Sequence, residues 1–213
     1  MRFDFLIFDL DGTLSDPKLG VVRCMNYALS SFDYAPRGED EIAQYIGPPL
    51  EETIQKLTGS QDEQHIDEMI VRYRERYFEI GYTENELYPN IEEMLSVLKN
   101  NNLAMGVCTS KHQTAAEKIL ERFEITKYFE FIDGPTEKTI KAKQLEKLLG
   151  ANTISKNSIM IGDRSVDLIA AKSNGLAKAG VLWGYGTSDE LNAEDPEYVF
   201  SSPRELVETF TAD

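Results

Sequence analysis

The sequence has 213 residues, of which 22 are basic and 37 are acidic, so its formal net charge is -15 at pH 7. This charge repels phosphate backbones and anionic lipids, which argues against a nucleic-acid polymer or a membrane as partner. A small anionic ligand remains compatible, because a metal ion or a few lysines reverse the field inside one pocket.

Short apolar runs that end in polar or glycine-rich turns recur along the chain and alternate with helical patterns. The runs are residues 3–12, 103–111, 130–135, 158–167 and 177–186. Strands that alternate with helices are typical of a parallel sheet covered by helices on both faces. We therefore expect an α/β protein, with the acidic segment 194–198 as a loop.

Residues 15–87 interrupt this alternation between the first and second expected strands. Residues 19–32 and 61–81 have the apolar spacing of helices, and no clear strand is present. The sequence therefore predicts a small helical domain at 15–87, inserted into an α/β core made of residues 1–14 and 88–213.

Polar side chains follow four of the expected strands. They are Asp9 and Asp11, Thr109 and Ser110, Asp163 and Asp167, and, after the third strand, Lys138 or Lys141. Because the carboxyl ends of parallel strands share one edge of a sheet, we expect these side chains to converge. Carboxylates gathered in this way repel one another unless a cation lies among them, and hard oxygen ligands suit Mg²⁺.

The types of these residues favour phosphoryl transfer. We expect Asp9 and Asp163 to bind the metal directly, Asp11 through its backbone carbonyl, and Asp167 from one helical turn further on. Asp9 is then the nucleophile that forms an aspartyl-phosphate, and Asp11 is the general acid. A lysine and a hydroxyl supply positive charge and donors to the phosphoryl oxygens.

Three segments of the chain resemble motifs of the haloacid dehalogenase-like hydrolase superfamily. They are "DLDGT" at 9–13, "VCTS" with Thr109, and "IGDRSVD" with Asp163 and Asp167. The resemblance implies a Rossmann-like core with a helical cap, catalytic Asp9, Asp11, Thr109 and a lysine, and phosphate contacts from Gly12, Thr13 and Ser110. The lysine motif is less clear, because Lys-Pro-x-Pro is absent. Alignment with a related group favours Lys138 over Lys141.

An acid at position 11 points to a phosphatase or a phosphomutase, where the leaving oxygen must be protonated. We expect a phosphatase for phosphoglycolate or a nucleoside 5′-monophosphate, as the resemblance implies. A β-phosphoglucomutase-like mutase and, from another class, a receiver-like or non-catalytic module are the alternatives. Lys111 lies beside the site, either on substrate or in solvent, and Asp16 suits a turn or a helix N-cap.

Two further expectations concern the cellular setting. Cys24 and Cys108 match no paired metal or disulfide spacing, which indicates a reduced, cytoplasmic protein. The oligomeric state is left open between a monomer and a homodimer.

Overall fold

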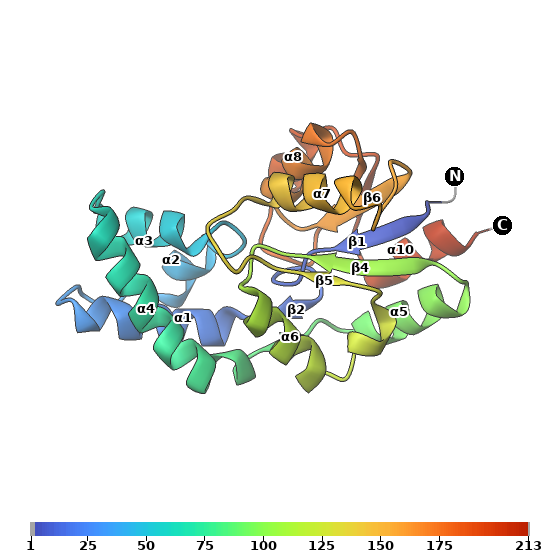
Figure 1. Ribbon diagram of the computed structural model, residues 1–213. Coiled ribbons are helices and arrows are strands. Elements are labelled where there is room, and N and C mark those ends of the chain that lie inside the picture. The colour runs from blue at the N-terminus through green and yellow to red at the C-terminus, as the bar shows by residue number, and fades with distance from the viewer. Residues whose placement is uncertain (1–2, 213) are drawn as a thin grey trace. The chain divides into compact units, whose positions relative to one another are not determined.

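The computed structural model describes residues 3–212 (Figure 1). The chain divides into two compact units, Met1–Asp16 with Leu87–Asp213, and Pro17–Glu86. The predicted insertion, 15–87, begins two residues before the second unit and ends one residue after it. Strands β2 (Ser15–Asp16) and β3 (Glu86–Leu87) pair with each other where the chain leaves the first unit and returns to it.

The first unit contains a six-stranded sheet in the order β5-β4-β1-β6-β7-β8. Every neighbouring pair in this sheet is parallel, which confirms the predicted α/β class. The strands are β1 (Phe5–Phe8), β4 (Ala104–Cys108), β5 (Ile132–Asp133), β6 (Ser158–Gly162), β7 (Ala177–Val181) and β8 (Tyr198–Phe200). Strand β8 was not predicted, because it has only three residues and begins at Tyr198, the last residue of the acidic segment expected to be a loop.

The central strand β1 lies between β4 and β6, and its register places Phe8 level with Val107 on one side and Ile161 on the other. The ladder continues past the strand, since the backbone N–H of Asp9 donates to the carbonyl of Ile161 at 2.9 Å. The carboxyl ends of β1, β4 and β6 therefore lie at one edge of the sheet, as the sequence predicted.

Helices cover both faces of this sheet. They are α5 (Ile91–Asn100), α6 (Gln113–Arg122), α7 (Lys141–Gly150), α8 (Ser165–Ser173), α9 (Ser188–Asn192) and α10 (Pro203–Thr211), with a 3₁₀ turn, η2, at Thr126–Tyr128. Helices α7 and α8 lie on one face, and α5 and α6 lie on the other (Figure 1). Ile7 packs against Leu145 and Ala171 from α7 and α8. Leu6 and Phe8, which point to the opposite face, are also buried, so β1 has a core on both sides.

The second unit is helical. It contains α1 (Lys18–Ser31), α2 (Glu39–Ala43), α3 (Leu50–Thr58), α4 (Glu63–Glu79) and the 3₁₀ turn η1 (Gly81–Thr83). Helix α1 packs against α4 and η1. The approach is close at Gly20, where an added Cβ would lie 2.3 Å from the carbonyl oxygen of Gly81.

Three charged residues bind one another inside this helical unit. The guanidinium of Arg76 donates to Glu84 Oε2 at 2.7 Å, and that of Arg23 donates to Glu84 Oε1 at 2.6 Å. We call Arg23, Arg76 and Glu84 the arginine cluster. Across residues 3–212, no helix is long and apolar enough to cross a membrane.

Candidate active site

Asp9 follows directly after β1 and is 1% exposed. Its Oδ1 accepts a hydrogen bond from the backbone N–H of Leu10 at 2.8 Å, and its Oδ2 lies 3.0 Å from the Nζ of Lys141. One donor from the backbone and one from a buried ammonium group fix both oxygens. The carboxylate is therefore held in one orientation at the edge of the sheet.

Residues 10–15, which follow Asp9, form a tight turn. Gly12 has a φ of 86°, the left-handed region that favours glycine, and its N–H donates to the carbonyl of Ser15 at 2.8 Å. An added Cβ at Gly12 would lie 2.2 Å from Asp163 Oδ2. Glycine is required here both by the backbone conformation and by the closeness of this carboxylate.

Asp163 lies one residue after β6 and is fully buried. The hydroxyl of Thr13 donates to its Oδ1 at 3.2 Å, and the backbone N–H of Tyr185 donates to its Oδ2 at 2.8 Å. Thr13 therefore joins the turn after β1 to the carboxylate after β6.

Asp167 occupies the first turn of α8, and it is also fully buried. Its Oδ2 accepts from the backbone N–H of Arg164 at 3.1 Å, and its Oδ1 forms an ion pair with the Nζ of Lys141. One carboxylate oxygen each from Asp9, Asp163 and Asp167 lie within 4.8 Å of one another. We call Asp9, Asp163, Asp167 and Lys141 the carboxylate cluster.

The pKa values of this cluster reflect crowding in a buried place. Burial raises the pKa of Asp163 well above its ordinary range, and the neighbouring charges of Asp167 and Asp9 add to this. Burial likewise raises the pKa of Asp167 to about 6, although Lys141 opposes it. Burial alone would lower the pKa of Lys141, but the Asp167 and Asp9 carboxylates outweigh this and raise it. The cluster therefore has more acids than its one lysine can compensate, and that lysine stays protonated.

Asp11 points to a second lysine. Its Oδ2 lies 2.6 Å from the Nζ of Lys111, and both side chains are largely buried. Burial raises the pKa of Asp11, although the Lys111 ammonium opposes the shift. The sequence indicated only that Lys111 lies beside the site, and left open whether it faces solvent.

Thr109 follows directly after β4 and is 1% exposed. Its Oγ1 accepts from the backbone N–H of Lys111 at 3.2 Å, and its carbonyl accepts from the amide of Gln144 at 3.1 Å. Ser110 lies between Thr109 and Lys111 and is half-buried. The structure therefore brings the second predicted strand end to the same edge as Asp9.

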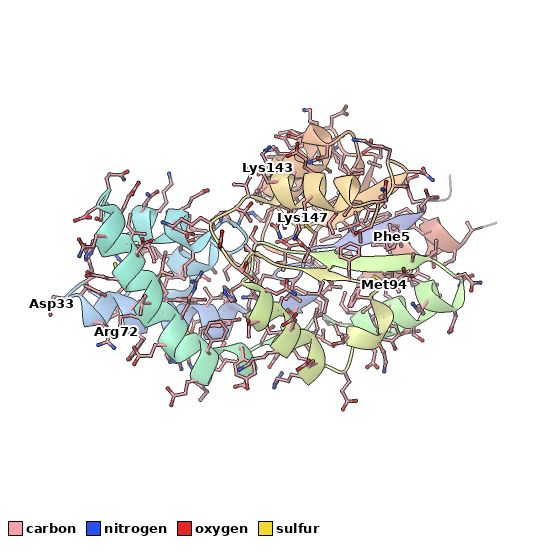
Figure 2. The ribbon with its side chains drawn as sticks, in the orientation of Figure 1. Phe5, Asp33, Arg72, Met94, Lys143 and Lys147 are labelled. Carbon is pink, nitrogen blue, oxygen red and sulfur yellow. The ribbon has the colours of Figure 1, made fainter. Side chains whose placement is uncertain are left out.

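Of the two lysines after β5, the structure places Lys141, and not the predicted Lys138, against the carboxylate cluster. Lys138, which the alignment favoured, is exposed in the loop before α7, whereas Lys141 is 1% exposed and contacts two carboxylates of the cluster. Lys143 and Lys147, further along α7, are exposed and pair with other acids (Figure 2). Lys141 is the first residue of α7, and the helix directs its side chain toward Asp9 and Asp167. Lys138 lies in the loop before the helix, where its side chain is exposed.

The sequence did not predict that residues 183–186, which follow β7, form hydrogen bonds to the segment after β1. The indole Nε1 of Trp183 donates to the carbonyl of Thr13 at 2.9 Å, and the hydroxyl of Tyr185 donates to Asp16. The N-cap of α1 is Pro17, so Asp16 is not the N-cap that the sequence allowed. The pattern "WGYG" at 183–186 was the only sequence signal for this segment.

Comparison with known proteins identifies the family. Residues 6–181 match the family model described as haloacid dehalogenase-like hydrolase. This match spans most of the chain, so the protein belongs to the haloacid dehalogenase-like hydrolases, as the motifs predicted.

Two curated relatives show the range of the family near this chain. A 5′-nucleotidase from Pseudomonas aeruginosa is 34% identical over 202 residues, 93% of this chain and 91% of that protein. The tyrosine-protein kinase PtkA from Mycobacterium tuberculosis is 34% identical over 192 residues, 88% of this chain but 65% of that longer protein.

A solved structure of a predicted phosphatase from Clostridium acetobutylicum has a TM-score of 0.93 and 32% identity to this chain. The alignment covers 98% of both chains. The chain is thus a hydrolase of the phosphatase class, as the sequence predicted.

Proposed function

We propose that this protein is a Mg²⁺-dependent phosphatase that hydrolyses a small phosphorylated metabolite through an aspartyl-phosphate on Asp9. The observation that carries this proposal is the carboxylate cluster, in which three buried acids lie together and one lysine pairs with two of them, Asp9 and Asp167. With the ion pair of Asp11 and Lys111 included, the site has four carboxylates for two lysines. Two negative charges are left without a partner when all of the acids are ionised, which matches one divalent cation.

The residues of the cluster fit a hard divalent ion such as Mg²⁺. Asp9, Asp163 and Asp167 offer oxygen atoms, which Mg²⁺ prefers, and these oxygens already lie within 4.8 Å of one another. Gly12 lies directly against the Asp163 carboxylate, and any side chain at this position would clash with that ligand. When bound, the ion would shield the negative charges of the carboxylates and the phosphoryl oxygens from each other.

The chain's own residues divide the reaction between them. Asp9, held by the Leu10 N–H and by Lys141, attacks the phosphorus while the bond to the leaving oxygen breaks. Asp11 gives its proton to that oxygen and then takes one from the water that hydrolyses the aspartyl-phosphate, which frees phosphate and restores Asp9. Thr109 and Lys141 supply a hydroxyl and a positive charge beside the transferred group.

For the substrate we propose a nucleoside 5′-monophosphate, with phosphoglycolate as the competing candidate. The similarity to a 5′-nucleotidase over nearly the whole chain supports the first. The second is carried by the resemblance in the sequence motifs. Both are phosphate monoesters of an alkyl oxygen, so both need the proton from Asp11. We further propose a cytoplasmic enzyme, monomeric or homodimeric, in keeping with two buried cysteines that form no disulfide.

Release of inorganic phosphate tests the proposal. The purified protein is given p-nitrophenyl phosphate and then a panel of phosphorylated metabolites, with Mg²⁺ or with EDTA, beside Asp9→Asn. We expect Mg²⁺-dependent turnover that Asp9→Asn abolishes. Turnover no higher than that of Asp9→Asn would contradict a phosphatase, and transfer of phosphate to a second sugar position instead of water would favour a mutase.

A further inference from the structure

The ion pair between Lys111 and Asp11 is part of the site, yet the reaction above assigns no task to Lys111. The side chain of Lys111 is 8% exposed, and its Nζ lies 2.6 Å from Asp11 Oδ2. A surface lysine is ordinarily extended into water and mobile, because burying it unpaired is unfavourable. Lys111 is instead buried and paired with a single acid, Asp11.

The backbone around Lys111 is fixed from two sides. Its N–H donates to Thr109 Oγ1 at 3.2 Å, and its carbonyl oxygen would lie 2.5 Å from a Cβ added to Gly134. The next turn is tied to the same loop, since the N–H of Gln113 donates to the carbonyl of Pro135 at 3.1 Å. The backbone of Lys111 is therefore held just after the end of β4, from where its side chain reaches Asp11.

The two oxygens of Asp11 have different surroundings. Oδ2 is held by Lys111, whereas Oδ1 is buried and has no hydrogen-bond partner in the described part of the chain. A buried carboxylate oxygen without a partner is unfavourable and uncommon in native proteins. A group brought by the substrate would satisfy this oxygen.

We propose that Lys111 is a positioning residue, which holds Oδ2 of Asp11 so that Oδ1 is kept for the leaving oxygen of the substrate. This inference rests on the proposed phosphatase function. As Asp9 bonds to phosphorus and the phosphorus–oxygen bond breaks, the proton passes from Asp11 to the leaving oxygen. Lys111 keeps its own proton and stays paired with the Asp11 carboxylate that this transfer leaves.

This role has a consequence that a purely structural ion pair lacks. An alkyl oxygen leaves as a strongly basic alkoxide and needs the proton from Asp11, whereas p-nitrophenolate is weakly basic and leaves without it. Loss of Lys111 should therefore slow hydrolysis of alkyl phosphates far more than hydrolysis of p-nitrophenyl phosphate. A structural defect would slow both substrates alike.

The experiment measures kcat and KM of wild type, Lys111→Met and Lys111→Arg on p-nitrophenyl phosphate and on the faster of adenosine 5′-monophosphate and phosphoglycolate. For Lys111→Met we expect kcat on the alkyl ester to fall about 100-fold, near the lower end of general-acid contributions, and kcat on the aryl ester to fall less than about threefold. Lys111→Arg, which keeps a positive charge, should recover part of the loss. Lys143→Met, on an exposed lysine of α7, is the matched control and should leave both rates unchanged.

A double-mutant comparison keeps the inference falsifiable if Lys111→Met is less stable than wild type. In an Asp11→Asn background, Lys111→Met should add almost no further loss on the alkyl ester, because the acid it positions is gone. An equal fall on both esters, a rise in KM alone, or a full additional loss in that background would overturn the role of Lys111. A wild type with no turnover above Asp9→Asn would instead overturn the proposed function, and this inference with it.

Discussion

Two charged clusters, one in each unit of the chain, have opposite charge balances. The carboxylate cluster has three acids and one lysine, whereas the arginine cluster of the helical unit has two arginines around Glu84. The pKa of Asp163 is raised, chiefly by burial, while hydrogen bonds from Arg76 and then Arg23 lower the pKa of Glu84 in spite of partial burial. The arginine cluster is complete without any ligand. The carboxylate cluster has fewer positive than negative charges, which supports the proposed binding of a cation there.

The difference gives a physical criterion for proposing that a charged cluster is functional. Burying charge is unfavourable unless partners compensate it, so a stable fold retains an uncompensated group only where something else stabilises it. Glu84 accepts hydrogen bonds from two guanidinium groups, which compensate its own negative charge. Asp163 receives only the neutral donors of Thr13 and of the Tyr185 backbone, and no cation among the described side chains is shown to pair with it.

The largest expected effect is the loss of Asp9. Asp9→Asn removes the nucleophile but keeps the shape of the side chain, and we expect phosphatase activity to fall by at least about 10⁴-fold. Glu84→Gln is the matched acid-to-amide change in the other cluster and should leave kcat within about threefold of wild type. Phosphate release under saturating substrate measures both. Similar losses of phosphatase activity in the two variants would contradict the assignment of catalysis to the carboxylate cluster alone.

The next effect concerns the lysine of the carboxylate cluster. Lys141→Met leaves Asp9 and Asp167 without their shared cation, which we expect to lower the free energy of unfolding by about 3–5 kcal/mol. It should also reduce kcat by about 10²–10³-fold, because a positive charge beside the phosphoryl group is lost. Lys138→Met serves as the control, with a change in stability within about 0.5 kcal/mol. Urea unfolding and phosphate release decide which lysine belongs to the site, and the reverse ranking would restore Lys138.

Addition of Mg²⁺ should stabilise the fold through the carboxylate cluster. Mg²⁺ at about a hundredfold excess over its dissociation constant should stabilise the wild type by about 3 kcal/mol. Asp163→Asn should lose that stabilisation. Without metal it should be at least as stable as wild type, because one of the crowded acids becomes neutral. Thermal unfolding with Mg²⁺ and with EDTA tests this, and a metal-induced shift retained in Asp163→Asn would count against the carboxylate cluster as the metal site.

The arginine cluster should depend on pH in a defined direction. Because the folded state lowers the pKa of Glu84 below its ordinary 4.5, the ionised carboxylate stabilises the fold above that pH, and this contribution is lost as the pH falls through the lower folded value. Glu84→Gln should therefore cost about 1–2 kcal/mol at neutral pH, a figure kept small by solvent screening, and progressively less below pH 4.5. Chemical unfolding at several pH values measures the difference. A cost that stays constant down to pH 3 would contradict an electrostatic role.

The smallest effect is expected for an acid close to the active site that has its own donor. Asp16 accepts a hydrogen bond from the hydroxyl of Tyr185, so it resembles Glu84 more than Asp163. Tyr185→Phe removes only that hydroxyl and keeps the backbone donor to Asp163, and we expect a loss of about 1 kcal/mol in stability with kcat within about threefold. A loss of activity as large as that of Lys141→Met would place Asp16 among the functional acids.

Much of the fold and part of the site could be predicted from the sequence for physical reasons. Strands buried on both faces have to be continuous apolar runs, so β1, β4 and β6 were visible as runs. Parallel strands bring their carboxyl ends to one edge, so Asp9 and Asp163 could be expected to meet even though more than 150 residues separate them.

Other features depend on contacts that local sequence does not encode. The spacing after β5 does not say which of Lys138 and Lys141 is the first residue of a helix, and the orientation of that residue decides its burial. The bond between Asp16 and Tyr185 joins positions 169 residues apart in the chain. The backbone carbonyl of Lys111 lies close to Gly134 in a neighbouring loop, where an added Cβ would be 2.5 Å from it.

The most direct test of the central claim is to trap the covalent intermediate on Asp9. The enzyme is mixed with p-nitrophenyl phosphate and Mg²⁺, quenched during turnover and treated with borohydride, which reduces an aspartyl-phosphate to homoserine. Peptide mass spectrometry should then show homoserine at position 9 only when substrate was present, and none in Asp9→Asn. An active enzyme that yields no homoserine at position 9, or yields it at another aspartate, would contradict Asp9 as the nucleophile.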